Sequence, residues 1–120
     1  MLSQIGQISM NAHDVDRATA FYADTLGVKL LFRAGGMSFF DCAGVRLMLS
    51  KPSSPEYDHP GSVLYFKVDD IRSAHGRLES RGVAIVKEPH VIAKMPDHEL
   101  WMSFFRDSEG NTLALMSEVR

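Results

Sequence analysis

Two histidines, a carboxylate and an indole gather in one short stretch of this 120-residue chain. His90 and His98 flank the stretch, and Glu99 and Trp101 follow directly. Imidazole titrates near neutral pH, so the two histidines could exchange protons with a substrate, with Glu99 as a third catalytic candidate. The alternative is a loop with a proline turn, exposed polar residues and one packed tryptophan. We favour that interpretation, because a short motif becomes a site only when geometry supports it.

The other histidines do not suggest a site. His13 adjoins a predicted helix cap, His59 lies in a proline-rich segment, and His75 falls within a predicted helix. We expect each to lie at the surface or to bond locally, because histidine tolerates both exposed and partly buried positions.

The composition is that of an ordinary globular chain. Hydrophobic residues make up 45% and charged residues 23%, which suits one domain with a packed core. The formal net charge is −2 without any basic block, so nucleic-acid binding is not expected. The single cysteine, Cys42, cannot form an internal disulfide, and no leader or membrane-spanning run is visible. We therefore expect a cytoplasmic protein with no membrane partner.

The chain contains an internal repeat. Aligning Asp14 with Asp70 also pairs the apolar residues that follow at helical spacing. The tetrapeptide Met-Ser-Phe-Phe at 37–40 recurs letter for letter at 102–105, and each copy leads to a glycine and a pair of leucines. Two matches in the same order indicate a duplication. The chain then divides into module one at 1–50, a proline-containing linker at 51–61 and module two at 62–120.

Each module predicts the same series of elements. In module one, Ile5, Ile8 and Met10 mark a strand, and a helix follows that Asp14 caps and Gly27 ends. Three strands come next, at 28–33, 37–42 and 45–50. Module two predicts a strand at 63–68, a helix over 70–82 and strands at 83–87, 100–106 and 112–117.

This series predicts an α+β fold of two βαβββ modules. Each helix must bury its apolar stripe on one face of its sheet. The other faces can then curl together into a half-open, eight-stranded, barrel-like cleft with the two helices outside. Ligands favour such mouths and module boundaries.

Two motifs on this frame resemble the vicinal-oxygen-chelate superfamily, the glyoxalase, bleomycin-resistance and dioxygenase type. The run 14–22, with Leu26 and Gly27, is similar to the family's helix, which begins with aspartate and carries Phe-Tyr and then Leu-Gly. The run 105–111 is similar to its Asp-Pro-x-Gly-Asn turn, although Ser108 replaces the usual proline. The resemblance covers residues 5–118 and implies a single domain and a homodimer. It leaves the reaction open, because this fold hosts many chemistries.

The resemblance also implies four metal-ligand positions, one in the first and one in the last strand of each module. Here they hold Gln7, Met48, Val63 and Ala114, and the repeat independently aligns Gln7 with Val63 and Met48 with Ala114. Metal ions such as zinc and iron need imidazole, thiolate or carboxylate ligands, which this set lacks. We therefore expect no metal at these positions and no cofactor.

Strand alternation extends the predicted cleft face. If Gln7 faces the cleft then Ser9 does too, and Tyr65 shares the parity of Val63. The resulting floor is apolar with scattered amide, hydroxyl and phenol groups, which suits a neutral or weakly polar organic ligand. Core packing is an open alternative for Tyr65 and Met48. The expected ligand-binding residues are Gln7, Ser9, Met48, Tyr65, His90, His98 and Trp101.

These observations favour a small-molecule-binding protein of the sequestering or resistance kind. The alternative is a glyoxalase-, epimerase- or dioxygenase-like enzyme. Such an enzyme would use a relocated metal at His90, His98 and Glu99, or acid–base chemistry of the two histidines alone. A third hypothesis is a structural or regulatory dimer subunit whose cleft is vestigial.

Overall fold

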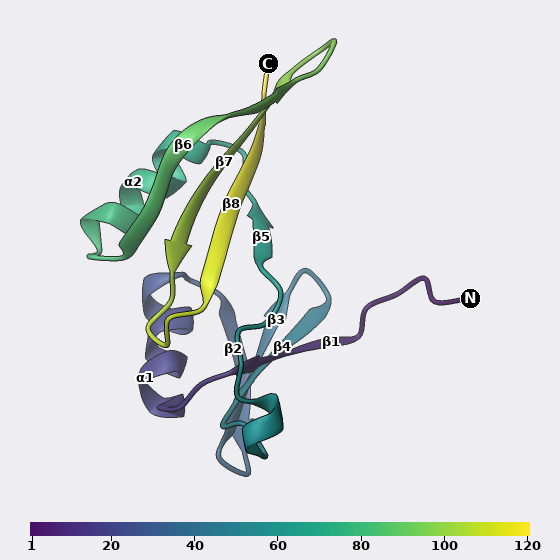
Figure 1. Ribbon diagram of the computed structural model, residues 1–120, viewed down its shortest axis with the longest axis vertical. Helices are drawn as coiled ribbons and strands as arrows, with labels where there is room; N and C mark the ends of the chain where they lie inside the picture. The colour runs from purple at the N-terminus through teal and green to yellow at the C-terminus, as the bar shows by residue number, and fades with distance from the viewer. The chain divides into compact units, whose positions relative to one another are not determined.

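The computed structural model describes residues 1–120 as two compact units, Met1–Gly61 and Ser62–Arg120. Each unit contains one four-stranded sheet and one main helix (Figure 1). The first unit runs β1 (Gln7–Asn11), α1 (Val15–Ala20), the π-helical turn η1 (Phe21–Thr25), β2 (Lys29–Ala34), β3 (Met37–Cys42), β4 (Val45–Ser50) and the 3₁₀ helix η2 (Pro55–Tyr57). The second unit runs β5 (Leu64–Lys67), α2 (Ile71–Ser80), β6 (Ala84–Lys94), β7 (Glu99–Arg106) and β8 (Thr112–Val119).

The two sheets share one topology. The strand order is β1-β4-β3-β2 in the first unit and β5-β8-β7-β6 in the second. In each, the first strand pairs in parallel with the last, and the remaining neighbours are antiparallel. The predicted α+β fold of two βαβββ modules is therefore confirmed. The half-open cleft depends on how the two units pair, and it stays a prediction.

Aspartate caps begin both helices, as the sequence predicts. The Asp14 carboxylate accepts a hydrogen bond from the Arg17 N–H at 3.0 Å, and the Asp70 carboxylate accepts one from the Ser73 N–H at 3.1 Å. These bonds satisfy backbone donors that the first turn of a helix leaves free. The helices begin where the repeat places them because the cap is local to the sequence.

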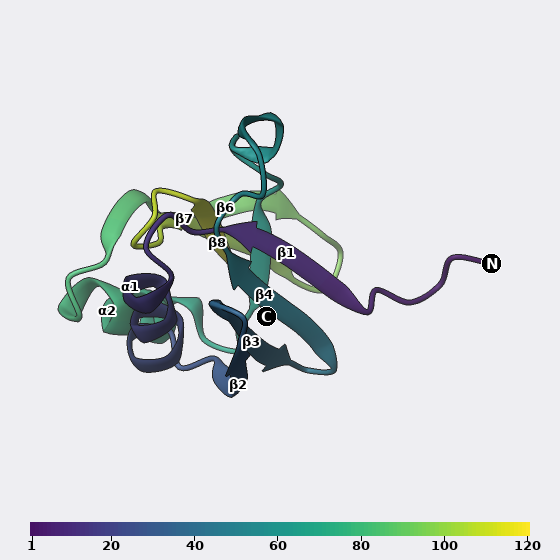
Figure 2. The same ribbon diagram turned by 90° about the horizontal axis from the view of Figure 1, so that it is seen from below.

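One face of each helix is buried against its sheet. Helix α1 packs on β3 and β4, and α2 packs on β6, β7 and β8 (Figure 2). The buried residues recur at helical spacing, so a single stripe faces the strands. Tyr22, rather than Phe21, is the fully buried aromatic residue of this stripe. The stripe contains Val15, Ala18, Thr19 and Tyr22 in the first unit and Ile71, His75 and Leu78 in the second.

Strand β6 corrects the predicted boundaries. The sequence predicts a strand at 83–87 followed by a possible loop, whereas β6 continues through Pro89 to Lys94 and includes His90. Proline is tolerated because β6 is an edge strand, and its pairing with β7 is interrupted by register shifts. At the other end of the chain, Ile5 lies outside β1 and is 65% exposed, so it does not belong to the first strand.

No helix is both long enough and apolar enough to span a membrane. The cytoplasmic location stays a prediction.

The two copies of Met-Ser-Phe-Phe differ in how their buried serines are satisfied. Thr19 Oγ1 donates to the Val15 carbonyl oxygen at 2.6 Å, and Ser38 Oγ lies 2.6 Å from the same hydroxyl. Because the one threonine proton is used, Ser38 must be the donor to Thr19. The equivalent Ser103 is also fully buried, but its hydroxyl has no hydrogen-bond partner. The serine hydroxyl thus bonds to the helix in the first unit, whereas in the second unit it has no hydrogen-bond partner.

This difference predicts opposite costs for one substitution. Ser38→Ala should lower the free energy of unfolding by about 1 kcal/mol, because it removes a buried hydrogen bond. Ser103→Ala should leave stability unchanged or raise it slightly, because it removes an unsatisfied buried hydroxyl. Urea unfolding followed by circular dichroism measures both, and each variant is the control for the other. If both variants lost the same free energy of unfolding, the hydrogen bond of Ser38 would contribute no more to stability than the unbonded hydroxyl of Ser103.

Candidate functional site

Each sheet has a face turned away from its own helix, which we call the open face. In the first unit, Met48 pairs with Ser9 on one side and with Phe39 on the other. Cross-strand partners lie on the same face of a sheet. The Gln7 side-chain amide donates to the Met48 sulfur at 3.7 Å. The structure therefore brings the predicted residues Gln7, Ser9 and Met48 together on one open face.

Two phenylalanines and an arginine complete this face. The rings of Phe32 and Phe39 stack with centroids 4.7 Å apart. The Arg46 guanidinium lies 5.8 Å from the Phe32 centroid and 5.7 Å from the Phe39 centroid, within cation–π range. Phe32 nevertheless remains 45% exposed. The open face of the first unit thus offers an aromatic platform beside one positive charge.

The open face of the second unit carries a similar aromatic cluster. Tyr65 and Phe104 both pair with Ala114, and their rings meet edge to face with centroids 6.0 Å apart. The His90 ring lies 6.4 Å from Phe104. Phe104 occupies the same place in its Met-Ser-Phe-Phe copy as Phe39 does in the other. The predicted residues Tyr65 and His90 are therefore joined through a phenylalanine that sequence reasoning did not single out.

The sequence did hold a signal for these phenylalanines. The second Phe of each copy, Phe40 and Phe105, is almost fully buried. Because side chains alternate along a strand, the Phe before it must point to the other face. Phe32 was harder to find, since its pairing with Phe39 follows a register shift in β2.

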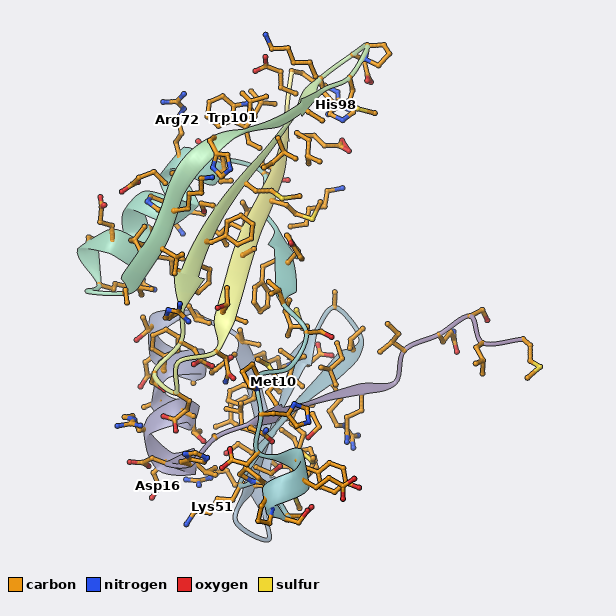
Figure 3. The ribbon with its side chains drawn as sticks, viewed as in Figure 1. Met10, Asp16, Lys51, Arg72, His98 and Trp101 are labelled. Carbon is orange, nitrogen blue, oxygen red and sulfur yellow. The ribbon has the colours of Figure 1, made fainter.

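His98 lies away from this cluster, at the tip of the β6–β7 hairpin (Figure 3). Its ring Nδ1–H donates to the Asp97 carboxylate at 2.7 Å. This hydrogen bond, with the charges of His98 and Arg120, lowers the pKa of the exposed Asp97 carboxyl. His90 uses its own Nδ1–H on the Glu88 carbonyl oxygen at 2.8 Å. The two histidines therefore have separate local partners.

Trp101 lies on the helix side of its sheet. It alternates in step with Ser103 and Phe105, both buried beneath α2, and its ring lies 5.0 Å from the Arg72 guanidinium (Figure 3). The Trp101 indole N–H donates to Glu99 at 3.2 Å. An open hollow of ≈ 330 Å³ adjoins this pair, lined by the start of α2 and the last residues of the chain.

The suggested catalytic group of His90, His98 and Glu99 is therefore not assembled. Glu99 faces Trp101 on the helix side, whereas His90 faces Phe104 on the open face. The three are not among the potential metal ligands that lie close together, which are His75, Glu79 and Glu88. The register of the hairpin also separates His90 from Glu99, because His90 pairs with Met102 whereas Glu99 pairs with Lys94.

The four positions of the expected metal site do not fit a metal ion. The Gln7 amide offers its N–H groups to the Met48 thioether, and neither group is a good ligand for zinc or iron. In the second unit, Val63 and Ala114 have only hydrocarbon side chains. Around their aromatic rings, the open faces offer aromatic and thioether surface, the Arg46 guanidinium and a few neutral hydrogen-bonding groups. That chemistry suits stacking on a flat organic molecule better than polarising a carbonyl.

Comparison with known proteins identifies relatives along most of the chain. The family model described as the Glyoxalase/Bleomycin resistance protein/Dioxygenase superfamily matches residues 4–115. A glyoxylase-like domain-containing protein of Didymella fabae is 31% identical over 122 residues, covering 93% of this chain and 91% of that protein.

Two solved structures are similar at comparable identity. TnmS3, an antibiotic binding protein from Streptomyces sp. CB03234, is 27% identical with a TM-score of 0.77, covering 98% of this chain and 97% of that one. Lactoylglutathione lyase from Agrobacterium tumefaciens is 25% identical with a TM-score of 0.76, covering 96% of this chain and 93% of that one. Similar chains thus include both a binding protein and an enzyme.

Proposed function

Because the chain belongs to the glyoxalase/bleomycin resistance protein/dioxygenase superfamily, and the superfamily's metal positions hold no imidazole, thiolate or carboxylate here, we propose that it binds a small organic molecule without transforming it. The observation that carries this proposal is the set Gln7, Met48, Val63 and Ala114. A metal-dependent member needs donors at these positions to hold a Lewis acid. A binding protein needs only surface that complements its ligand.

The open faces supply such surface. Phe32 and Tyr65 are 45% and 46% exposed although each contacts another aromatic ring. Large exposed aromatic side chains cost free energy in water, which a stacked ligand would recover. Arg46, whose guanidinium lies over the Phe32 and Phe39 rings, adds hydrogen-bond donors in the first unit. We expect a flat, mostly apolar ligand with one or two acceptor groups.

The likeness to TnmS3 supports a sequestering or resistance role. That protein binds an antibiotic and matches this chain over nearly the full length of both. Sequestration requires affinity but no acid, base or metal, which agrees with the separation of His90 from His98 and Glu99. The ligand-binding residues that we propose are Gln7, Ser9, Met48, Phe32 and Phe39 on the open face of the first unit. On the open face of the second unit they are Tyr65, His90 and Phe104.

Titration with 1-naphthol tests this role, since the probe is flat, apolar and carries one hydroxyl. Amide signals of open-face residues should shift in ¹H–¹⁵N NMR spectra, whereas those of the helix-side residues Leu47 and Leu113 should not. Tyr65→Ala and Phe32→Ala should each weaken binding by about 2- to 10-fold, the usual worth of one aromatic contact. Tyr57→Ala is the matched control, because Tyr57 is 55% exposed but lies in η2. Shifts confined to the helix side, or equal weakening by Tyr57→Ala, would contradict the proposal.

A lyase-like enzyme is the second candidate, favoured by the likeness to lactoylglutathione lyase. The chain should neither cleave S-lactoylglutathione to glutathione and the corresponding 2-oxoaldehyde nor form it from them, with or without added zinc or nickel, because the metal positions hold no zinc-binding set. Product analysis by chromatography checks this outcome, with an authentic lactoylglutathione lyase as the positive control. Metal-dependent turnover by the wild type would place the enzyme hypothesis first. Persistence of that turnover in a His90→Ala/His98→Ala variant would then exclude the histidine mechanism.

We also expect a homodimer, as the family resemblance implies. The edge strands β2 and β6 expose apolar side chains, including Leu31 at 42%, Val86 at 49% and Ile92 at 46%. Apolar groups gathered on edge strands are typical of surfaces that another chain covers. Light scattering at micromolar concentration should give twice the mass of one chain, and Leu31→Glu should lower it. A monomer across that concentration range would show that the dimer does not form.

A further inference from the structure

A buried histidine and two carboxylates meet on the helix side of the second unit. His75 lies on α2 and is only 5% exposed. Glu79 lies one helical turn further along α2, and Glu88 lies on the neighbouring strand β6. Ligand atoms of the three side chains all lie within 4.8 Å of one another. This cluster is separate from the open faces, because α2 covers the opposite side of the sheet.

The histidine in this cluster has no hydrogen bond. Neither His75 Nδ1 nor His75 Nε2 has a hydrogen-bond partner, although both atoms are buried. His75 Nε2 does lie 2.6 Å from Glu88 Oε2, so the two atoms are close without being aligned as donor and acceptor. A tetrahedral zinc ion holds two such ligand atoms roughly 3.3 Å apart, a separation that a small rotation of the exposed Glu88 side chain would give. A buried polar ring with no aligned partner is otherwise costly.

The internal repeat shows that the fold does not require this cluster. His75 follows Asp70 at the spacing at which Thr19 follows Asp14. Glu79 matches Ala23 in the same way, and Glu88 follows Gly82 as Arg33 follows Gly27. The first unit therefore has threonine, alanine and arginine where the second has histidine and two glutamates.

The first unit satisfies its own groups at these positions. Thr19 bonds Ser38, and Arg33 pairs with Asp16 at 2.7 Å. In the second unit, the serine equivalent to Ser38 is Ser103, whose hydroxyl is the other buried side-chain group without a hydrogen bond. The second unit therefore gathers buried polar groups without hydrogen bonds at this helix–sheet contact. The first unit has no such groups at the equivalent positions.

We infer that His75, Glu79 and Glu88 bind a zinc ion. One imidazole nitrogen and two carboxylate oxygens are ligands that zinc accepts, with water in the fourth position. Residues four apart share one face of a helix, so His75 and Glu79 can reach the same ion. His75 is held by burial, whereas Glu79 and Glu88 are exposed and can adjust to the ion. Two carboxylates and a neutral imidazole would balance the 2+ charge.

This inference departs from two expectations drawn from the sequence. His75 was expected at the surface or bonded locally, and the chain was expected to hold no metal. The four positions implied by the family resemblance still offer no donors, so the proposed ion lies elsewhere in the fold. The inference also stands apart from the proposed function, which concerns the open faces and needs no ion.

Calorimetric titration of the untagged, chelator-treated chain with zinc chloride tests the site. The wild type should bind one equivalent. Glu79→Gln and Glu88→Gln should each weaken binding by more than about tenfold, because each removes a direct ligand. Glu56→Gln is the matched control, since it removes the same charge from an exposed glutamate in the first unit. Circular dichroism should show that all three variants remain folded.

Thermal unfolding gives a second readout. Zinc should raise the melting temperature of the wild type and of Glu56→Gln, but not that of Glu88→Gln, because ligands stabilise only the state that binds them. Absence of wild-type binding up to ~1 mM zinc would overturn the inference. Zinc binding that persists in both Glu79→Gln and Glu88→Gln would also overturn it, as would zinc binding that only the His90→Ala/His98→Ala variant loses. Failure of the 1-naphthol experiment would leave this result unaffected, so the two proposals can be judged separately.

Discussion

Each unit has one main helix to cover a four-stranded sheet, and the rest of the structure depends on the fact that this helix covers only one face of the sheet. A sheet has two faces, and a single amphipathic helix can cover only one of them. The stripe from Val15 to Tyr22 and the stripe from Ile71 to Leu78 meet that requirement. The opposite faces are left to be covered by something other than their own unit. The exposed rings of Phe32 and Tyr65 are the direct consequence.

The duplicated units solve the helix–sheet contact in different ways. In the first unit, the Thr19 hydroxyl hydrogen-bonds both its own helix and Ser38, so both buried hydroxyl groups have partners. In the second, the larger His75 takes the place of the threonine, and its ring lies against Glu88 of the edge strand. Ser103 then loses the partner that Ser38 has. Histidine in place of threonine thus removes the hydrogen-bond partner of the serine, and Glu79 and Glu88 add two carboxylates beside the histidine ring.

Local chemistry explains which features could be predicted from the sequence. The caps at Asp14 and Asp70 and the strands at 37–42 and 45–50 depend on residues close along the chain, and the repeat supplied each of them twice. The length of β6 could not be predicted, since Pro89 normally ends a strand and only the edge position of β6 makes it tolerable.

The site was harder to predict because it depends on pairing between distant residues. The family resemblance implied that Gln7 and Met48 belong to one site, and the structure brings their side chains into contact. Trp101 was grouped with His90 because the two are near in sequence, yet the alternation of β7 directs Trp101 to the helix side. The importance of His75 was missed for a related reason. A histidine on a helix has no evident role until a second element brings a carboxylate such as Glu88 beside it.

The alternation of β7 also makes the two proposals compatible. Phe104 and Ser103 are neighbours in sequence, but Phe104 belongs to the aromatic cluster of the open face and Ser103 lies beneath α2. The superfamily's metal positions fall on the open face, where an ion would polarise a ligand. An ion at His75 would instead lie on the far side of the strand and join α2 to the edge strand β6. Such an ion would stabilise the second unit without contacting a molecule bound to the open face. The proposed ion would therefore hold two elements of the fold together, whereas an ion at the superfamily's positions would act on a bound molecule.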